Sequence, residues 1–290
     1  MRPWLVASLA VIVVAAAHPL DAAESELALQ RVSTDPVNDK FTNELGTITL
    51  PGRSITFLVT RRPDDARFTE AYLLFPGSPG YGNLGAEQGV WRYSLKGNFL
   101  VRTRRHFLGP GTLAVVIDAP SDQQGSFAYA FRASARYGED VRAVTQAVER
   151  QFGRLDWTFI GTSEGTVTAT HAARMLGDVA RRLVLTASLV SGASKGERAL
   201  SEADVAAANV PVLWVHHERD PCWATRYDTV KSIAARLKQL LITVSGADGA
   251  TGAPCEARSE HGFVGREIAT IRAIRAWVRT GEAAALVDRP

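Results

Sequence analysis

The chain has 290 residues, of which 46% are hydrophobic and 22% charged, and it contains 24 Gly, 13 Pro and 2 Cys. These fractions are typical of globular domains, so they exclude a disordered chain, a collagen-like repeat and a small scaffold held by many disulfides. The net charge is only +3 and the arginines are spread along the sequence, whereas nucleic-acid binding needs basic residues clustered on one face. The charge therefore predicts no nucleic-acid partner.

Residues 1–23 have the features of a secretory signal peptide. Arg2 supplies a positive charge, residues 4–17 are apolar or weakly polar, and small residues offer cleavage after Ala17 or Ala23. The alternative is a retained membrane anchor, but at about 1.5 Å per residue the apolar run is too short for about 30 Å of hydrocarbon. We therefore expect an exported protein, periplasmic or secreted, with one domain over residues 24–290 and no stable membrane insertion after the leader is removed.

Beyond the leader, short apolar runs alternate with helical patterns. Residues 47–60 alternate in polarity around Pro51-Gly52, which predicts a hairpin of two strands at an exposed edge. Further strands are predicted, in chain order, at residues 71–75, 113–118, 157–161, 183–187, 212–215 and 241–245. Helices are predicted at residues 95–107, 139–152, 165–176, 228–239 and 266–279.

Two of these helices carry more specific expectations. In the last helix, apolar residues recur at helical spacing and should face the core: Ile268, Ile271, Ile274 and Trp277. The segment 99–105, with its apolar start and its arginines, is interpreted as an ordinary amphipathic element at the surface.

The alternation of apolar strands and amphipathic helices predicts an α/β domain. It calls for a mostly parallel sheet of about eight strands, covered by helices on both faces, with the hairpin adding antiparallel strands at one edge. In such sheets ligands bind outside the carboxyl ends of the strands. The residues with chemical potential lie at those ends.

The segment Gly161-Thr162-Ser163-Glu164-Gly165 matches the pattern G-x-S-x-G between a predicted strand and a predicted helix. Such a turn pushes the serine hydroxyl above the sheet, and its flanking glycines avoid collisions with neighbouring backbone. We expect Ser163 to be a nucleophile, with the backbone N–H of Glu164 at the helix start as one oxyanion donor. The alternative is an ordinary serine in a glycine-flanked turn.

A carboxylate and an imidazole follow later strands. Asp220 comes a few residues after the strand at 212–215 and directly before Pro221, where a carboxylate can orient an imidazole. His261 lies in the loop between the last strand and the last helix, from which it can reach Ser163. The order Ser, Asp, His along the chain is the order expected for a triad on this architecture.

Other residues remain alternatives for these roles. Three carboxylates compete with Asp220: Asp118, Glu218 and Asp248. Among the histidines, His106 and His171 fall in helices and are more typical of surface or core positions, whereas His216 and His217 adjoin the acid. A metal site made of His216, His217 and Asp220 would lack the ligand spacing typical of metal sites, so neither a metal nor another cofactor is predicted.

The two cysteines support the same assignment. Cys222 lies two residues after Asp220, and Cys255 lies six residues before His261. An oxidising compartment allows a disulfide between them, which would tie the acid loop to the base loop. Such a bridge either preorganises the acid and base or is a plain stabilising link; both need the two loops to be adjacent.

Residues 76–80 end the predicted strand at 71–75, where a second oxyanion donor should originate. Pro79 has no N–H, so Ser78 is the first candidate donor and Gly77 the second. The alternative is a Pro/Gly turn with no catalytic role.

With these motifs in this order, essentially the whole mature sequence resembles the α/β-hydrolase family of serine hydrolases, in the manner of exported bacterial members. Many family members have His-Gly where this chain has Pro76-Gly77, which affects the geometry of the oxyanion hole. The family often inserts a cap after the sixth strand; the corresponding segment here, 191–209, is short and polar. The resemblance therefore implies little or no cap and an open, shallow site for a small or exposed ester.

The expected reaction is hydrolysis of a carboxylic ester through an acyl-enzyme, with Ser163, His261 and Asp220 as the triad. An acyltransferase, an amidase or peptidase, and a lyase on the same triad are alternatives. A non-catalytic binding protein that keeps the pocket is a further alternative. The sequence does not predict which ester is the substrate, nor the oligomeric state.

Overall fold

The computed structural model describes residues 27–34, 40–191 and 199–289. The predicted signal peptide and both of its cleavage points lie outside the described residues. Within the described part of the chain, none of the helices combines the length and the apolar character needed to cross a membrane.

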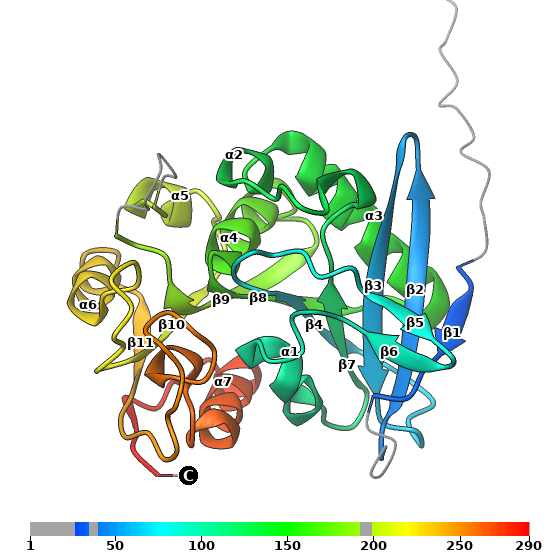
Figure 1. The fold of residues 1–290 in the computed structure, drawn as a ribbon. Coiled ribbons are helices and arrows are strands. Elements are labelled where there is room, and N and C mark those ends of the chain that lie inside the picture. Colours follow the sequence, from blue (N-terminus) through cyan, green and yellow to red (C-terminus); the bar gives the residue numbers. More distant parts are fainter. Residues whose placement is uncertain (1–26, 35–39, 192–198, 290) are drawn as a thin grey trace, which may run out of the picture.

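The centre of the fold is a ten-stranded sheet with the order β1-β2-β3-β7-β4-β8-β9-β10-β11-β12 (Figure 1). Its strands are β1 (Leu29–Arg31), β2 (Thr42–Leu50), β3 (Arg53–Arg61), β4 (Glu70–Phe75), β7 (Thr112–Ile117), β8 (Asp156–Ser163), β9 (Ala180–Ser188), β10 (Val212–His217), β11 (Leu240–Val244) and β12 (Leu286–Val287). All strands from β7 to β12 in this order pair in parallel, and β1, β2, β3 and β7 pair antiparallel. The prediction of about eight mostly parallel strands misses only the short edge strands β1 and β12.

The predicted hairpin is present, with its turn at Pro51-Gly52, but its position in the sheet differs from the prediction. β3 pairs with β7 on its other side, and β1 pairs with β2. Phe57, Leu58 and Val59 in β3 are completely buried. The expectation of two exposed-edge strands is therefore wrong for β3, because a run with apolar residues on both faces belongs inside a sheet.

Helices cover both faces of the sheet, as predicted (Figure 1). One face carries α2 (Tyr129–Arg132), α3 (Ala135–Phe152), α4 (Gly165–Met175), α5 (Glu202–Ala206) and α6 (Tyr227–Arg236). The other face carries α1 (Phe99–Thr103), the 3₁₀ turn η1 (Arg104–Phe107) and α7 (Glu267–Thr280). Two further 3₁₀ turns, η2 (Ser121–Gln123) and η3 (Glu260–Gly262), and a small hairpin of β5 (Gly85–Glu87) and β6 (Val90–Arg92) lie in the loops. Successive strand residues such as Trp214 and Val215 enter different apolar clusters, one on each face.

Two helix expectations need correction. The segment 99–105 is not an amphipathic surface element: Phe99, Leu100 and Val101 are at most 1% exposed and fill the core between the sheet and α7. Arg104 is also buried, where its guanidinium donates to Thr60 Oγ1 at 3.0 Å. In α7, Ile268 is 43% exposed, whereas the other three residues of its predicted inward face are buried.

Part of the segment 191–209 lies outside the described residues, namely 192–198. The described remainder contains α5, whose start has a capping box between Ser201 and Asp204. Leu200 and Val205 are buried in the core cluster beneath it. This part of the segment therefore packs onto the body of the domain.

Candidate active site

Ser163 stands at a sharp turn between β8 and α4. Its backbone has φ +54°, a left-handed conformation that is strained for a residue with a side chain. A Cβ atom on Gly161 would collide with the backbone of Gly165, and a Cβ on Gly165 would collide with the carbonyl oxygen of Phe75. Both glycines of the motif are thus required by close backbone approach, and the turn presents Ser163 at the carboxyl end of the central strand β8.

The segment after β4 lies directly against this serine. A Cβ on Gly77 would be 2.9 Å from the Cβ of Ser163, so the segment could not approach as closely with any other residue there. Among the hydrogen bonds of the described residues, none uses the backbone N–H of Gly77, Ser78 or Glu164. These N–H groups, which sequence analysis proposed as oxyanion donors, are available for a ligand.

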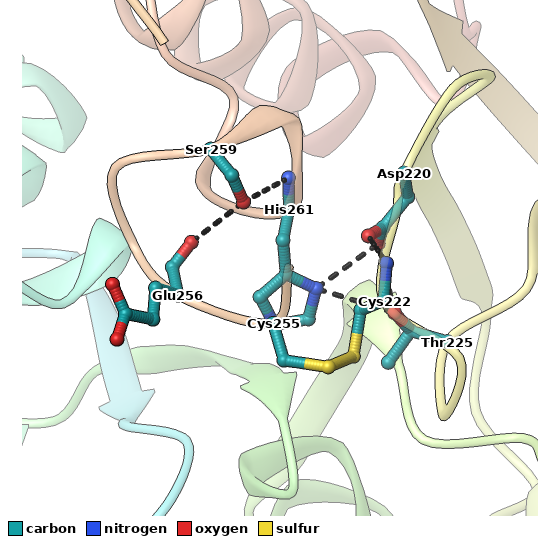
Figure 2. Close-up of a disulfide and its surroundings, with 7 residues drawn as sticks. All are labelled: Asp220, Cys222, Thr225, Cys255, Glu256, Ser259 and His261. Atoms are coloured by element: carbon teal, nitrogen blue, oxygen red, sulfur yellow. Dashed lines mark hydrogen bonds and ion pairs between the residues drawn. A yellow bond between two sulfur atoms is a disulfide. The ribbon is translucent and has the colours of Figure 1, made fainter. Parts of the chain in front are cut away.

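Asp220 and His261 come together from the loops after β10 and β11. His261 Nδ1 lies 3.0 Å from Asp220 Oδ2 (Figure 2). The carboxylate has no exposed area, and its other oxygen accepts a 2.9 Å hydrogen bond from the N–H of Cys222. Burial raises the pKa of Asp220, but its hydrogen bond with His261 and the neighbouring imidazoles outweigh burial, so the pKa lies below its ordinary value. Asp220 is therefore ionised and can accept a hydrogen bond from Nδ1 of His261.

Thr225 is a member of this cluster that sequence analysis missed. Its completely buried hydroxyl lies 2.8 Å from Asp220 Oδ2 and 3.2 Å from His261 Nδ1 (Figure 2). Nothing in the sequence distinguishes this threonine, because its contacts with Asp220 and His261 depend on how the loop after β10 folds back toward the imidazole.

The base loop is fixed by its own backbone contacts. Ser259 Oγ accepts the N–H of His261 at 3.2 Å and donates to the carbonyl oxygen of Glu256 at 2.8 Å (Figure 2). Arg102 donates to the carbonyl oxygen of Gly262 at 2.7 Å and also pairs with Glu267. These contacts fix the backbone at His261 and at the residue that follows it.

The predicted disulfide between Cys222 and Cys255 is present, with a Cα–Cα distance of 4.4 Å. It joins the acid loop to the base loop on the side of the His261 ring (Figure 2). The two loops are therefore adjacent, as both interpretations of the cysteines require.

A cavity of about 470 Å³ opens between these elements. Its lining includes Gly77, Ser78, Thr162, Ser163, His261 and Gly262. The rest of the lining comes from residues 94, 95, 97–99 and 255–258. Ser163 and His261 thus share one cavity, with Asp220 buried behind the imidazole; within the described residues no hydrogen bond joins Ser163 to His261.

The competing carboxylates are engaged elsewhere. Asp118 accepts the N–H groups of Gly82 and Leu84 at 2.9 and 2.8 Å and so fixes the loop after β4. Glu218 accepts a hydrogen bond from a serine on the neighbouring strand end, and Asp248 pairs with an arginine at 2.6 Å.

The two histidines at the end of β10 have structural positions. His216 is completely buried, and this burial lowers its pKa to about 4. His217 Nε2 lies 2.9 Å from the carbonyl oxygen of Gly246. No group of three His, Cys, Asp or Glu side chains suited to hold a metal is found in the part of the chain that the structure describes.

No protein-family model and no curated protein matches the sequence. The fold, however, is similar to many solved structures. An esterase from an Arctic intertidal metagenomic library is 13% identical, with a TM-score of 0.54 over 85% of this chain and 98% of that chain. Est1E from Butyrivibrio proteoclasticus is 14% identical, with a TM-score of 0.55 over 81% and 97%. A serine hydrolase without a lid from Xanthomonas campestris is 17% identical, with a TM-score of 0.52 over 92% and 99%.

Proposed function

The chain has the α/β-hydrolase fold, and from the site built on it we propose that the protein is a serine hydrolase that cleaves a carboxylic ester. Ser163 is the nucleophile, His261 the general base and acid, and Asp220 the residue that orients the imidazole. The observation that carries the proposal is the 3.0 Å contact between His261 Nδ1 and Asp220 Oδ2 at the wall of the cavity that also contains Ser163.

The reaction has two halves. His261 Nε2 takes the proton of the Ser163 hydroxyl as its oxygen bonds to the ester carbonyl carbon, and the carbonyl oxygen becomes an oxyanion. The imidazolium then gives this proton to the leaving alkoxide, which departs as an alcohol. In the second half, His261 takes a proton from water as the water attacks the acyl-enzyme, and returns it to Ser163 as the acid leaves. The ionised Asp220 stabilises the imidazolium in both halves.

The oxyanion is stabilised by backbone N–H groups. Glu164 contributes its N–H from the start of α4, where the helix dipole adds partial positive charge. Ser78 and Gly77 supply a second donor from the segment that packs against Ser163. Preorganised donors of this kind typically account for about 10²–10³ in turnover each.

The substrate is a small or exposed ester. The cavity of about 470 Å³ has polar residues on its walls, including Ser94 and Asn98, beside Leu95 and Phe99. Among the solved structures with the same fold, one is described as lacking a lid and another is Est1E with bound ferulic acid. A short acyl group fits within this cavity.

The proposal includes export to the periplasm or the medium. The Cys222–Cys255 bridge supports it, because such bonds persist in oxidising compartments. Expression of the full chain with N-terminal sequencing of the mature protein tests this point; an intact Met1 in the cytoplasmic fraction would contradict it.

Hydrolysis of p-nitrophenyl esters with C2 to C16 acyl chains tests the function. The expected result is turnover with an optimum at C2–C4, and a loss of more than about 10³-fold in Ser163→Ala and in His261→Ala. A folded wild-type protein that hydrolyses none of the esters and does not react with a fluorophosphonate would contradict the proposal and favour a binding protein. An optimum at C12 or longer would contradict the small-substrate part alone.

A further inference from the structure

A buried arginine links the two segments that supply the oxyanion donors. Arg132 is the last residue of α2, and its side chain is only 2% exposed. Its Nη2 donates to the carbonyl oxygen of Pro79 and to Glu164 Oε2, both at 2.9 Å. Pro79 follows the proposed donor Ser78, and Glu164 is itself the other proposed donor.

The guanidinium is held in place by further contacts. Its Nε donates to the carbonyl oxygen of Phe127 at 3.1 Å, and Nη1 lies 3.3 Å from Thr168 Oγ1 in α4. The guanidinium carbon lies 4.3 Å from the centre of the Phe127 ring. With hydrogen bonds in several directions and a ring against its face, the side chain has little freedom to move.

The loop after β4 is packed onto this group. A Cβ on Gly80 would collide with both terminal nitrogens of the guanidinium, and Gly80 has φ +79°. Gly80 is thus packed tightly against the guanidinium, and the Pro79 carbonyl oxygen lies at an ordinary hydrogen-bond distance of 2.9 Å, so movement closer causes overlap and movement away loses the bond. One rigid planar group thus determines how far the loop stands from the first turn of α4.

Stability alone is a weak reason for this arrangement. Burial of an ion pair often contributes little or nothing to stability compared with apolar residues of the same size. Nη2 donates to both acceptors, and the contacts of Nε, Nη1 and the Phe127 ring fix the plane of the guanidinium. Nη2 therefore holds Pro79 and Glu164 at fixed relative positions, which the nitrogen of a flexible lysine side chain would do less well.

We propose that Arg132 is a positioning residue that sets the distance between the two sides of the oxyanion hole, through Pro79 on one side and the Glu164 carboxylate on the other. The inference rests on the proposed function and explains what the Glu164 side chain does: it anchors the guanidinium and takes no part in proton transfer. Displacement of one donor relative to the other weakens binding of the oxyanion more than binding of the ester.

The test compares Arg132→Met with Arg136→Met. Arg136 is a matched control because it also lies over a phenylalanine, at 4.9 Å from the Phe131 ring, and pairs with Asp122, but at the surface. For each folded variant, kcat and KM are measured with p-nitrophenyl acetate. The inhibition constant of a trifluoromethyl ketone, whose adduct with Ser163 carries an oxyanion, is measured beside them.

In Arg132→Met we expect kcat to fall about 10²-fold and the inhibition constant to rise by a similar factor, with KM within about threefold. Arg132→Lys should recover little. An ammonium group cannot also donate to the Phe127 carbonyl oxygen and Thr168 Oγ1 or lie flat on the Phe127 ring, so nothing would fix the nitrogen between Pro79 and Glu164. Arg136→Met should behave as wild type. A folded Arg132→Met with kcat and inhibition constant within threefold of wild type overturns the inference, while the wild-type activity leaves the proposed function intact.

Glu164→Gln keeps the proposal testable if Arg132→Met does not fold. The Glu164 side chain is 23% exposed and keeps its backbone N–H, so this variant should fold. We expect a parallel change in kcat and in the inhibition constant of about 10-fold, because the amide oxygen of glutamine accepts a weaker hydrogen bond from the guanidinium than a carboxylate does. Unchanged values for both would overturn the inference. Wild-type protein that is inert to ester and fluorophosphonate would instead refute the proposed function.

Discussion

Removal of the Cys222–Cys255 bridge should affect stability and catalysis separately. The two cysteines are 33 residues apart in sequence. For a closed loop of this length, the chain-entropy model predicts a loss of roughly 3–4 kcal/mol of unfolding free energy in the double variant Cys222→Ser/Cys255→Ser. That is a large part of the roughly 5–15 kcal/mol typical of a domain. Urea unfolding followed by tryptophan fluorescence measures it.

The same variant tests whether the bridge preorganises the acid and base. Cys222 holds Asp220 Oδ1 through its N–H, and Cys255 lines the cavity in the loop that carries His261. Without the bridge the two loops are less constrained, so kcat measured in the absence of urea should fall about 10-fold, with KM little changed. Reductant should reproduce both effects in wild type and have none in the double variant. Equal stability and equal kcat in the bridged and unbridged proteins would refute the reasoning; lower stability with unchanged kcat would leave the bridge a plain link.

Three further predictions concern single residues. Burial lowers the pKa of His216 to about 4 from the ordinary 6.5. Between these two values the unfolded chain binds more protons than the folded chain, so the free energy of unfolding should fall by about 2 kcal/mol between pH 7 and pH 5. His216→Phe should remove this part of the decrease in urea unfolding, and an unchanged pH dependence would contradict the assignment. Gly161→Ala should lower the free energy of unfolding by about 1–3 kcal/mol and abolish most of the esterase activity, because the added Cβ would collide with the backbone of the turn. Gly177→Ala is the control, since its Cβ would make an ordinary contact at 3.9 Å. Equal Tm values for the two variants would contradict the prediction. Thr225→Val should lower kcat about 10-fold, because the hydroxyl contacts to Asp220 and His261 are lost. Thr225→Ser keeps a hydroxyl and should have the wild-type kcat. A wild-type kcat in the valine variant would show that the hydroxyl is dispensable.

The sequence predicts the central part of the fold well because strong local patterns coincide with tertiary roles. The β8–α4 turn is predictable, since its two glycines are required by close backbone contacts that only glycine allows. The cysteine pairing is predictable because only two cysteines exist. The α/β-hydrolase fold that these features imply is confirmed.

The remainder depends on contacts that a linear pattern does not contain. β12 has two residues and exists through its pairing with β11, so no periodicity marks it. The run at 99–101 is apolar, but the sequence does not say that a second core on that face of the sheet will bury it. Thr225 reaches the acid and the imidazole because its loop folds back onto them, and Arg132 reaches Pro79 and Glu164 because the short helix α2 packs beside them. In each case the missing information is long-range packing.

The most direct test of the central claim is peptide mapping by mass spectrometry after reaction with a fluorophosphonate. We expect one adduct per chain, on the hydroxyl of Ser163, and a strongly reduced rate of labelling in His261→Ala and Asp220→Asn. An adduct on another residue, or labelling of Ser163 that is equally fast without the imidazole, would contradict it.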